Sequence, residues 1–262
     1  MRPAPDPRRE VLARDLPRLP GEDLYAELAA AVRWEDVGRG RRGAVLTRPD
    51  ATGAVPLVRT TTRYGTPAQR FRPVHERLAR RVRAAAHLPA DFDNALAERY
   101  TDAYATMGAH SDQAQDLAEG SYIAVFSCYE NPDAPAGRTL RFEPKDTADG
   151  SGGEPFALPL PHHGVVAFPL TANRLLRHRI VLDRRAGAPE NPWLGITFRT
   201  SKTRLRYVPD GPLLPDGTRL VLADEDQRQE LYALRRRENR ETTFTYPPLP
   251  HTLSESDLLP PV

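Results

Sequence analysis

The chain has 262 residues, including 27 Pro, 17 Gly and one Cys, and its 37 basic residues nearly balance 35 acidic ones for a net charge of +2. A chain of this length can bury a full core as one large domain. The single cysteine, Cys128, excludes an internal disulfide and a cysteine-rich zinc site, so we expect a buried small hydrophobe. No apolar stretch approaches the roughly 18 residues that a membrane span requires. We therefore expect a globular, cytoplasmic protein without a membrane partner.

The N-terminal part of the chain contains an extension followed by a helix. Residues 1–20 are rich in proline and arginine, so we expect an arm outside the core. A helix is predicted over about 22–33, where Leu24, Leu28 and Val32 recur every four residues. Its apolar face is expected to pack on the outside of a sheet.

A second helix is predicted to begin at Pro73, because proline suits the first helical turn, and to end before Pro89. It is also expected to cover a sheet. Three histidines, His75 and His87 on or beside this helix and His251 in the C-terminal tail, are expected to be solvated.

From residue 92 to 202 the pattern changes to short apolar or alternating runs separated by Gly, Pro, Asn and Asp. Many short strands joined by turns are typical of a sandwich or jelly roll, so the expected fold class is mainly β with flanking helices (α+β). Residues 147–153 are predicted to form a flexible hairpin tip. The predicted strands lie near 44–47, 55–62, 94–100, 121–130, 138–144, 155–160, 164–170, 175–182 and 193–201.

The C-terminal part, 211–262, is predicted to contain a hairpin around Pro215–Gly217, a helix over about 224–240 and a wrapping tail, all packed on the same domain as 21–210. The helix begins with acidic residues and ends with basic ones, which complements its dipole. We expect the basic cluster Arg235–Arg237 to be solvated.

One constellation of residues points to chemistry. His110 and Asp112 are separated by one residue, a spacing that lets both side chains reach one metal ion from a strand or its end. A distant histidine, His178, completes a set of two histidines and one carboxylate, which binds Fe(II) and leaves three coordination positions open. Downstream, Arg199 lies in an apolar alternating run, where a buried guanidinium needs an anionic partner.

With these residues in place, the sequence resembles the AlkB-like branch of the Fe(II)/2-oxoglutarate-dependent dioxygenases over roughly 55–202. The resemblance implies a double-stranded β-helix (jelly roll, cupin-like) core over about 92–202. It also implies that dioxygen and 2-oxoglutarate are consumed, that succinate and CO2 are released, and that a substrate C–H bond is hydroxylated. The motifs that carry it are Arg63–Gly65, Phe92–Tyr100, His110–Asp112, Gly120–Ala124, Leu158–Gly164, Asn173–His178 and Leu194–Arg199.

The resemblance also implies roles for individual residues. Iron is expected on His110, Asp112 and His178, and 2-oxoglutarate on Arg199 with Tyr100 and Ser201. Three positions depart from the family pattern and leave open how the second carboxylate of 2-oxoglutarate is held. Trp193 stands where the family has a further arginine, and Glu98 and Gly195 stand where it has asparagines.

Four residues are candidates for substrate contact: Tyr64, Arg63, Tyr122 and Trp193. Aromatic residues on strands are as readily explained as core, so both interpretations stay open. Family members acting on duplex DNA have an extra aromatic hairpin after the segment that matches Tyr64–Gly65. Here that segment leads almost directly into the predicted helix at Pro73.

Three functions follow from these observations. The favoured one is hydroxylation of a small molecule, such as a nucleoside-like compound or a secondary metabolite. The second is oxidative dealkylation of alkylated DNA or RNA, with nucleic acid as partner and the arginines at 39, 41, 42 and 63 as contacts. The third is a catalytically inactive binding module on the same fold.

Overall fold

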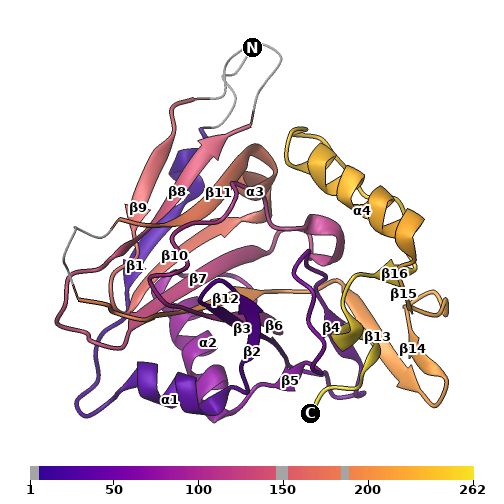
Figure 1. Ribbon diagram of the computed structural model, residues 1–262, viewed down its shortest axis with the longest axis horizontal. Coiled ribbons are helices and arrows are strands. Elements are labelled where there is room, and N and C mark those ends of the chain that lie inside the picture. Colours follow the sequence, from indigo (N-terminus) through magenta and orange to yellow (C-terminus); the bar gives the residue numbers. More distant parts are fainter. Residues whose placement is uncertain (1–5, 146–152, 184–188) are drawn as a thin grey trace.

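The computed structural model describes residues 6–145, 153–183 and 189–262, which form two facing β-sheets with helices on the outside (Figure 1). The main sheet has the strand order β1-β10-β7-β12-β6-β3-β2 with antiparallel neighbours, and β5 pairs in parallel with β3. The small sheet has the order β11-β8-β9 and is also antiparallel. The expected mainly β jelly roll with flanking helices is therefore confirmed. The main-sheet strands are β1 (Leu12–Asp15), β2 (Glu35–Gly38), β3 (Arg41–Thr47), β5 (Gln69–Arg70), β6 (Asn94–Tyr100), β7 (Tyr122–Tyr129), β10 (Gly164–Pro169) and β12 (Trp193–Arg199), and the small-sheet strands are β8 (Arg138–Pro144), β9 (Phe156–Pro159) and β11 (Leu176–Leu182).

Side-chain alternation along β7 separates two apolar cores. Ala124 and Cys128 point to the side covered by helices α1 and α2, and Cys128 is the buried small hydrophobe that was expected. Ile123 and Val125 point into the interior between the two sheets. The predicted hairpin tip over 147–153 lies, apart from Gly153, outside the described residues.

Three helices were predicted from the sequence and are present: α1 (Leu24–Ala31), α2 (Pro73–Ala85) and α4 (Glu225–Glu238). The Asp23 carboxylate accepts the Ala26 N–H at 2.9 Å and so caps α1. None of the described helices is both long and apolar enough to span a bilayer. Short elements that the sequence did not predict are α3 (Leu170–Leu175) and the 3-10 segments η1 (Pro7–Glu10), η2 (Ala114–Asp116) and η3 (Glu255–Leu258).

The prediction that residues 1–20 lie outside the core is wrong for residues 12–16. β1 pairs with β10 from Leu12 opposite Ala167 to Asp15 opposite Gly164, and the following Leu16 is only 3% exposed. Without β1, β10 would leave an open edge of unpaired N–H and C=O groups.

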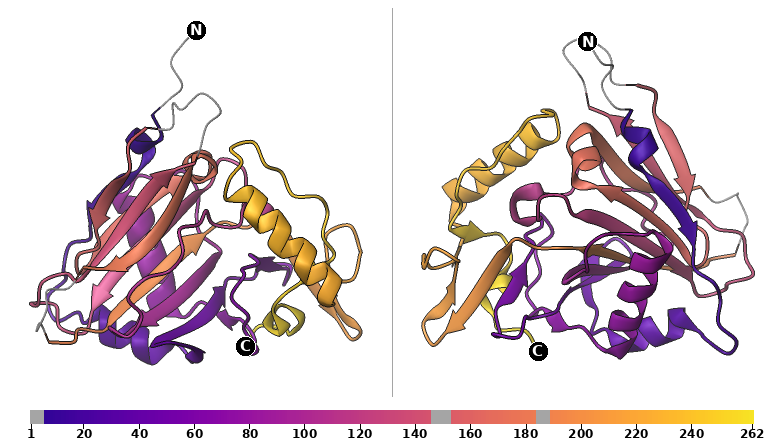
Figure 2. Two further views of the ribbon diagram at one scale, coloured as in Figure 1. Left: turned by 45° about the horizontal axis from the view of Figure 1, so that its top comes forward. Right: turned by 180° about the vertical axis from the view of Figure 1, so that it is seen from behind.

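The C-terminal segment packs beside the main sheet, with α4 well apart from α1 and α2 (Figure 2). The predicted turn is present, because the Leu214 N–H donates to the Thr218 carbonyl at 2.8 Å. The tail is more deeply buried than expected, since His251 is 3% exposed instead of solvated. The strands of the C-terminal part are β13 (Thr203–Val208), β14 (Gly211–Leu213), β15 (Val221–Leu222) and β16 (His251–Thr252). β13 pairs with β4 (Val55–Leu57), which is shorter than the predicted strand over 55–62.

The expectation of a solvated His75 is also wrong. This residue is 1% exposed, and its Nδ1 accepts the N–H of Arg72 at 3.0 Å at the start of α2. Burial, together with the nearby charge of Arg72, lowers the pKa of His75 to about 4. The imidazole therefore serves as a neutral hydrogen-bond acceptor at the helix start.

Buried His75 is predicted to weaken the fold in acid. Its pKa is lower in the folded chain than the ordinary value of 6.5, so the unfolded chain binds a proton first as the pH falls. Between pH 6.5 and 4 the free energy of unfolding should fall by up to about 1.4 kcal/mol per pH unit from this group. In His75→Asn the amide oxygen can still accept the Arg72 N–H but does not titrate. Urea unfolding at pH 7 and at pH 4.5 should show a smaller loss in the variant, and equal losses would contradict the prediction.

Candidate metal centre

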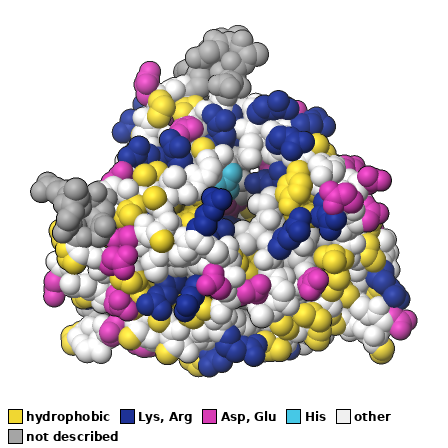
Figure 3. Space-filling view, in the orientation of Figure 1, with side chains coloured by type: hydrophobic (Ala, Val, Ile, Leu, Met, Phe, Trp, Pro, Cys, Tyr) yellow, Lys and Arg dark blue, Asp and Glu magenta, His cyan; other side chains and the backbone are white. Residues whose placement is uncertain are grey.

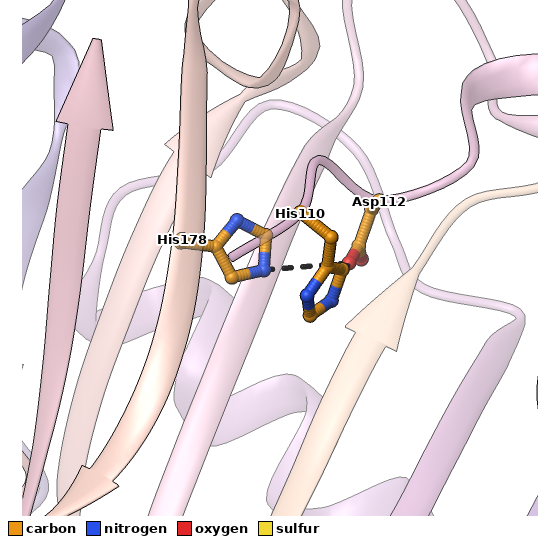
Figure 4. Close-up of side chains that lie close together, drawn as sticks. All are labelled: His110, Asp112 and His178. Carbon is orange, nitrogen blue, oxygen red and sulfur yellow. Dashed lines mark ion pairs between the residues drawn. The ribbon is translucent and has the colours of Figure 1, made fainter. Parts of the chain in front are cut away.

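Three side chains with metal-binding atoms meet between the sheets (Figure 4). His110 and Asp112 lie in the segment after β6, and His178 lies on β11. The backbones of the two histidines form a direct bridge, because the His110 N–H donates to the His178 carbonyl at 3.0 Å and the His178 N–H donates to the His110 carbonyl at 2.7 Å. The main chain therefore brings together residues that are far apart in the sequence.

The spacing of the donor atoms fits a single divalent ion. His178 Nε2 lies 3.4 Å from Asp112 Oδ1, and His110 Nε2 lies 3.9 Å from the same oxygen. Metal–ligand bonds of about 2.1 Å at right angles place neighbouring ligand atoms about 3 Å apart. Two imidazole nitrogens and one carboxylate oxygen form the facial set that suits non-haem Fe(II).

The protonation states of these groups also suit metal binding. His110 Nδ1 donates to the Gly108 carbonyl at 2.9 Å, so its Nε2 carries the free lone pair. Burial and the neighbouring His178 lower the pKa of His110 to about 4, which keeps this imidazole neutral at pH 7. Burial alone would raise the pKa of Asp112, but Arg199 and the two imidazoles hold it well below its ordinary value. The carboxylate is therefore ionised.

Arg199 forms an ion pair with the metal-ligand carboxylate. Its Nε and Nη2 lie 2.7 and 2.6 Å from Asp112 Oδ2, while Oδ1 faces the two histidines. Both side chains are less than one tenth exposed. The expected role of Arg199 in binding 2-oxoglutarate stays a prediction. In the structure two nitrogens of this arginine contact the carboxylate of Asp112, an arrangement that can orient Asp112.

The backbone around Asp112 is held by the segment that leads into β11. Its N–H donates to Asn173 Oδ1 at 2.8 Å, and Asn173 Nδ2 donates to the Asp112 carbonyl at 2.9 Å. The neighbouring Ser111 hydroxyl donates to the Leu176 carbonyl at 2.8 Å. Asn173 was part of a quoted motif but had no role assigned from the sequence.

The last turn of α4 holds the same segment from the other side. Asn239 Oδ1 accepts the Ser111 N–H at 2.9 Å, and Arg235 Nη2 donates to the Ser111 carbonyl at 2.8 Å. Glu238 Oε1 accepts the Ala114 N–H at 2.8 Å. The expectation of a solvated cluster is therefore wrong for Arg235, which is 7% exposed, although Arg236 and Arg237 are exposed. The local sequence carries no signal for these contacts, because their partners lie in distant segments.

The metal ligands line a cavity of about 410 Å³ that opens to the surface beside a histidine, with basic side chains around it (Figure 3). Its apolar wall includes Val125 from the main sheet and Leu140 and Ile180 from the small sheet. Its polar wall includes Arg41 and Glu98.

Two other predicted residues, Tyr100 and Trp193, are buried in the interior and do not line this cavity. Their rings lie 4.8 Å apart, and Trp193 Nε1 donates to Ser127 Oγ at 2.7 Å. A side chain at Gly195 would collide with the Trp193 ring. Trp193 and Gly195 thus belong to one packing arrangement, because the indole fills the space that a side chain at position 195 would need.

The remaining residues predicted to bind co-substrate or substrate lie away from His110, Asp112 and His178. Ser201 lies between β12 and β13, and its Oγ donates to the Leu57 carbonyl on β4 at 2.6 Å. Tyr122 packs against the core on the helix side of the main sheet. Arg63 and Tyr64 line a separate surface cavity, so none of these four residues contacts the cavity that holds the metal ligands.

No protein-family model matches the chain, and no curated protein matches it significantly. Among solved structures it is similar to a Pseudomonas putida prolyl-4-hydroxylase, with a TM-score of 0.41 and 17% identity over 73% of this chain and 92% of that one. It is also similar to OsALKBH1, with a TM-score of 0.38 and 18% identity over 62% of this chain and 78% of that one. Similarity this low does not carry an activity from one protein to another, so the function is inferred from the residues of the site.

Arg199→Gln is expected to weaken metal binding by about 10- to 100-fold, because Asp112 loses the charged partner that orients it. Titration of the purified protein with Co(II), followed by absorbance, measures this affinity. Arg141→Gln is the control, since Arg141 pairs with Asp183 on the surface. Equal affinities of the Arg199 variant and the wild type would exclude an orienting role.

Asn239→Ala tests whether α4 supports the metal centre. Loss of the acceptor for the Ser111 N–H should loosen the segment that carries His110 and Asp112 and lower Co(II) affinity by about tenfold. Arg236→Ala, an exposed change on the same helix, should leave the affinity unchanged. Unaltered Co(II) affinity with a lowered melting temperature would show that α4 stabilises the fold only.

Proposed function

We propose that this chain is a non-haem Fe(II)- and 2-oxoglutarate-dependent dioxygenase that hydroxylates a small molecule. The observation that carries the proposal is the convergence of His110, Asp112 and His178 on one point in the wall of a cavity. Two histidines and one carboxylate leave three adjacent positions on iron for a chelating co-substrate and dioxygen.

The residues fit the metal by donor type, spacing and protonation. Fe(II) would be held by Nε2 of both histidines and by Asp112 Oδ1, and together with 2-oxoglutarate and dioxygen it would supply the oxidant for C–H hydroxylation, with release of succinate and CO2. The chain itself keeps Asp112 ionised and oriented through Arg199. The apolar side chains of Val125, Leu140 and Ile180 limit the access of water to the bound groups.

A small molecule is the favoured substrate because of the size of the cavity. Its volume of about 410 Å³ lies within the range of about 300–1,000 Å³ typical of small-molecule sites. The short segment between Tyr64 and Pro73 offers few aromatic groups with which to compensate for unstacking a base.

Oxidative dealkylation of nucleic acid is the second candidate, and it is favoured by the basic side chains around the cavity mouth (Figure 3). Such an enzyme would bind single-stranded DNA with an affinity that falls steeply as salt rises. Absence of DNA binding at low ionic strength would leave the small-molecule hydroxylase.

His178→Ala is expected to abolish iron binding and the conversion of 2-oxoglutarate to succinate, because only two protein ligands remain. Succinate formed in the presence of Fe(II), dioxygen and candidate substrates measures turnover. His87→Ala is the matched control, since His87 is exposed beyond α2. Full activity of the His178 variant would refute the proposed metal site, and a wild-type chain that binds iron without forming succinate would instead be an inactive binding module.

A further inference from the structure

The metal cavity contains a second charged pair, formed by Arg41 on β3 and Glu98 on β6. Arg41 Nε donates to Glu98 Oε1 at 2.8 Å, and Arg41 Nη2 lies 2.5 Å from the same oxygen. Nη2 also donates to the Thr62 hydroxyl at 3.1 Å. The side chains of Arg41 and Glu98 are 17% and 8% exposed, and both line the cavity. Because both side chains are mostly buried and line the cavity, a ligand would reach this pair through the cavity.

The strand register explains how Arg41 reaches this position. Tyr100 on β6 lies opposite Arg41 of β3 on one side and opposite Trp193 of β12 on the other. On the β12 side, the Trp193 ring occupies the interior above Gly195. The Arg41 guanidinium therefore comes from β3, which pairs with β6 on the side opposite β12.

The other arginines of the cavity already have fixed tasks. Four arginines line it: Arg41, Arg59, Arg199 and Arg235. Arg59 binds Asp116 and two carbonyls of the C-terminal tail, and Arg235 binds Glu238 and the Ser111 carbonyl. Arg199 orients the metal ligand Asp112. Arg41 remains, since its acidic partner Glu98 is itself a cavity wall residue and the Thr62 and Tyr104 hydroxyls that it also contacts are neutral.

We propose that Arg41 binds the distal carboxylate of the 2-oxo acid co-substrate and that Glu98 is an internal carboxylate that competes for this guanidinium. The inference rests on the proposed function and deepens it. A carboxylate approaching from the cavity would meet the Arg41 guanidinium and the Thr62 hydroxyl, which both line it.

The competition has a consequence for affinity. With Glu98 ionised, the pair has no net charge, so a second carboxylate is attracted less strongly than by an isolated guanidinium. Neutralising Glu98 should therefore strengthen binding of a dicarboxylate, whereas removing the charge of Arg41 should weaken it. A 2-oxo acid without the distal carboxylate should respond to neither change.

Calorimetry of the Ni(II)-loaded protein with two ligands tests this inference without turnover. 2-Oxoglutarate carries the distal carboxylate, and 2-oxopentanoate has a methyl group in its place. In Arg41→Met we expect 2-oxoglutarate affinity to fall by about 10- to 100-fold, as for loss of a charged hydrogen bond, with 2-oxopentanoate unchanged. In Glu98→Gln we expect 2-oxoglutarate to bind several-fold more tightly. An exposed arginine on α2 supplies the control, Arg80→Met.

The double variant Arg41→Met/Glu98→Gln avoids leaving a buried charge unpaired and should also lose the preference for 2-oxoglutarate. Thermal unfolding of each variant shows that it is folded. An unchanged preference in both the single and double Arg41 variants, or weaker 2-oxoglutarate binding in Glu98→Gln, would overturn the inference while leaving the proposed function intact. If neither oxo acid binds the wild-type Ni(II) protein, the proposed function fails, and this inference fails with it.

Discussion

The buried carboxylate of Asp112 is the constraint on which the site depends. A carboxylate that is 6% exposed is costly unless charged and polar groups surround it. One oxygen is paired with Arg199, and the other faces His110 and His178. The second oxygen can bind a metal ion, because Arg199 pairs with the first. This division of the two oxygens gives the arginine an orienting role and leaves the carboxylate in the form that iron requires.

Support for the centre comes from three separate parts of the chain. Asn173 in α3 binds both backbone groups of Asp112, and the backbone bridge joins His110 to β11. Asn239 and the last turn of α4 bind Ser111. A ligand segment without a regular strand of its own thus acquires a fixed position through hydrogen bonds to elements that do have regular structure.

Much of the fold could be predicted because its signals are local. Alternation over β7 and β12, and the four-residue recurrence in α1, follow from which face of each element is buried. The spacing of His110 and Asp112 identified candidate ligands for the same reason. Burial of His75, His251 and Arg235 could not be predicted, because each meets partners supplied by segments distant in sequence. The N-terminal strand β1 was missed because its four residues show no alternating pattern and its pairing is dictated by the open edge of β10.

The sequence by itself determined the strand pattern, the outer helices and the two histidines and one aspartate suited to iron. Residue type and spacing are enough for these, because side-chain periodicity and ligand chemistry are local properties. Only the tertiary structure decided which guanidinium meets which carboxylate. Arg199 lies on Asp112 and Arg41 lies on Glu98 because strand register and packing bring these pairs together. With 35 acidic and 37 basic residues in the chain, many pairings satisfy the charge balance, and only the packed sheets select among them.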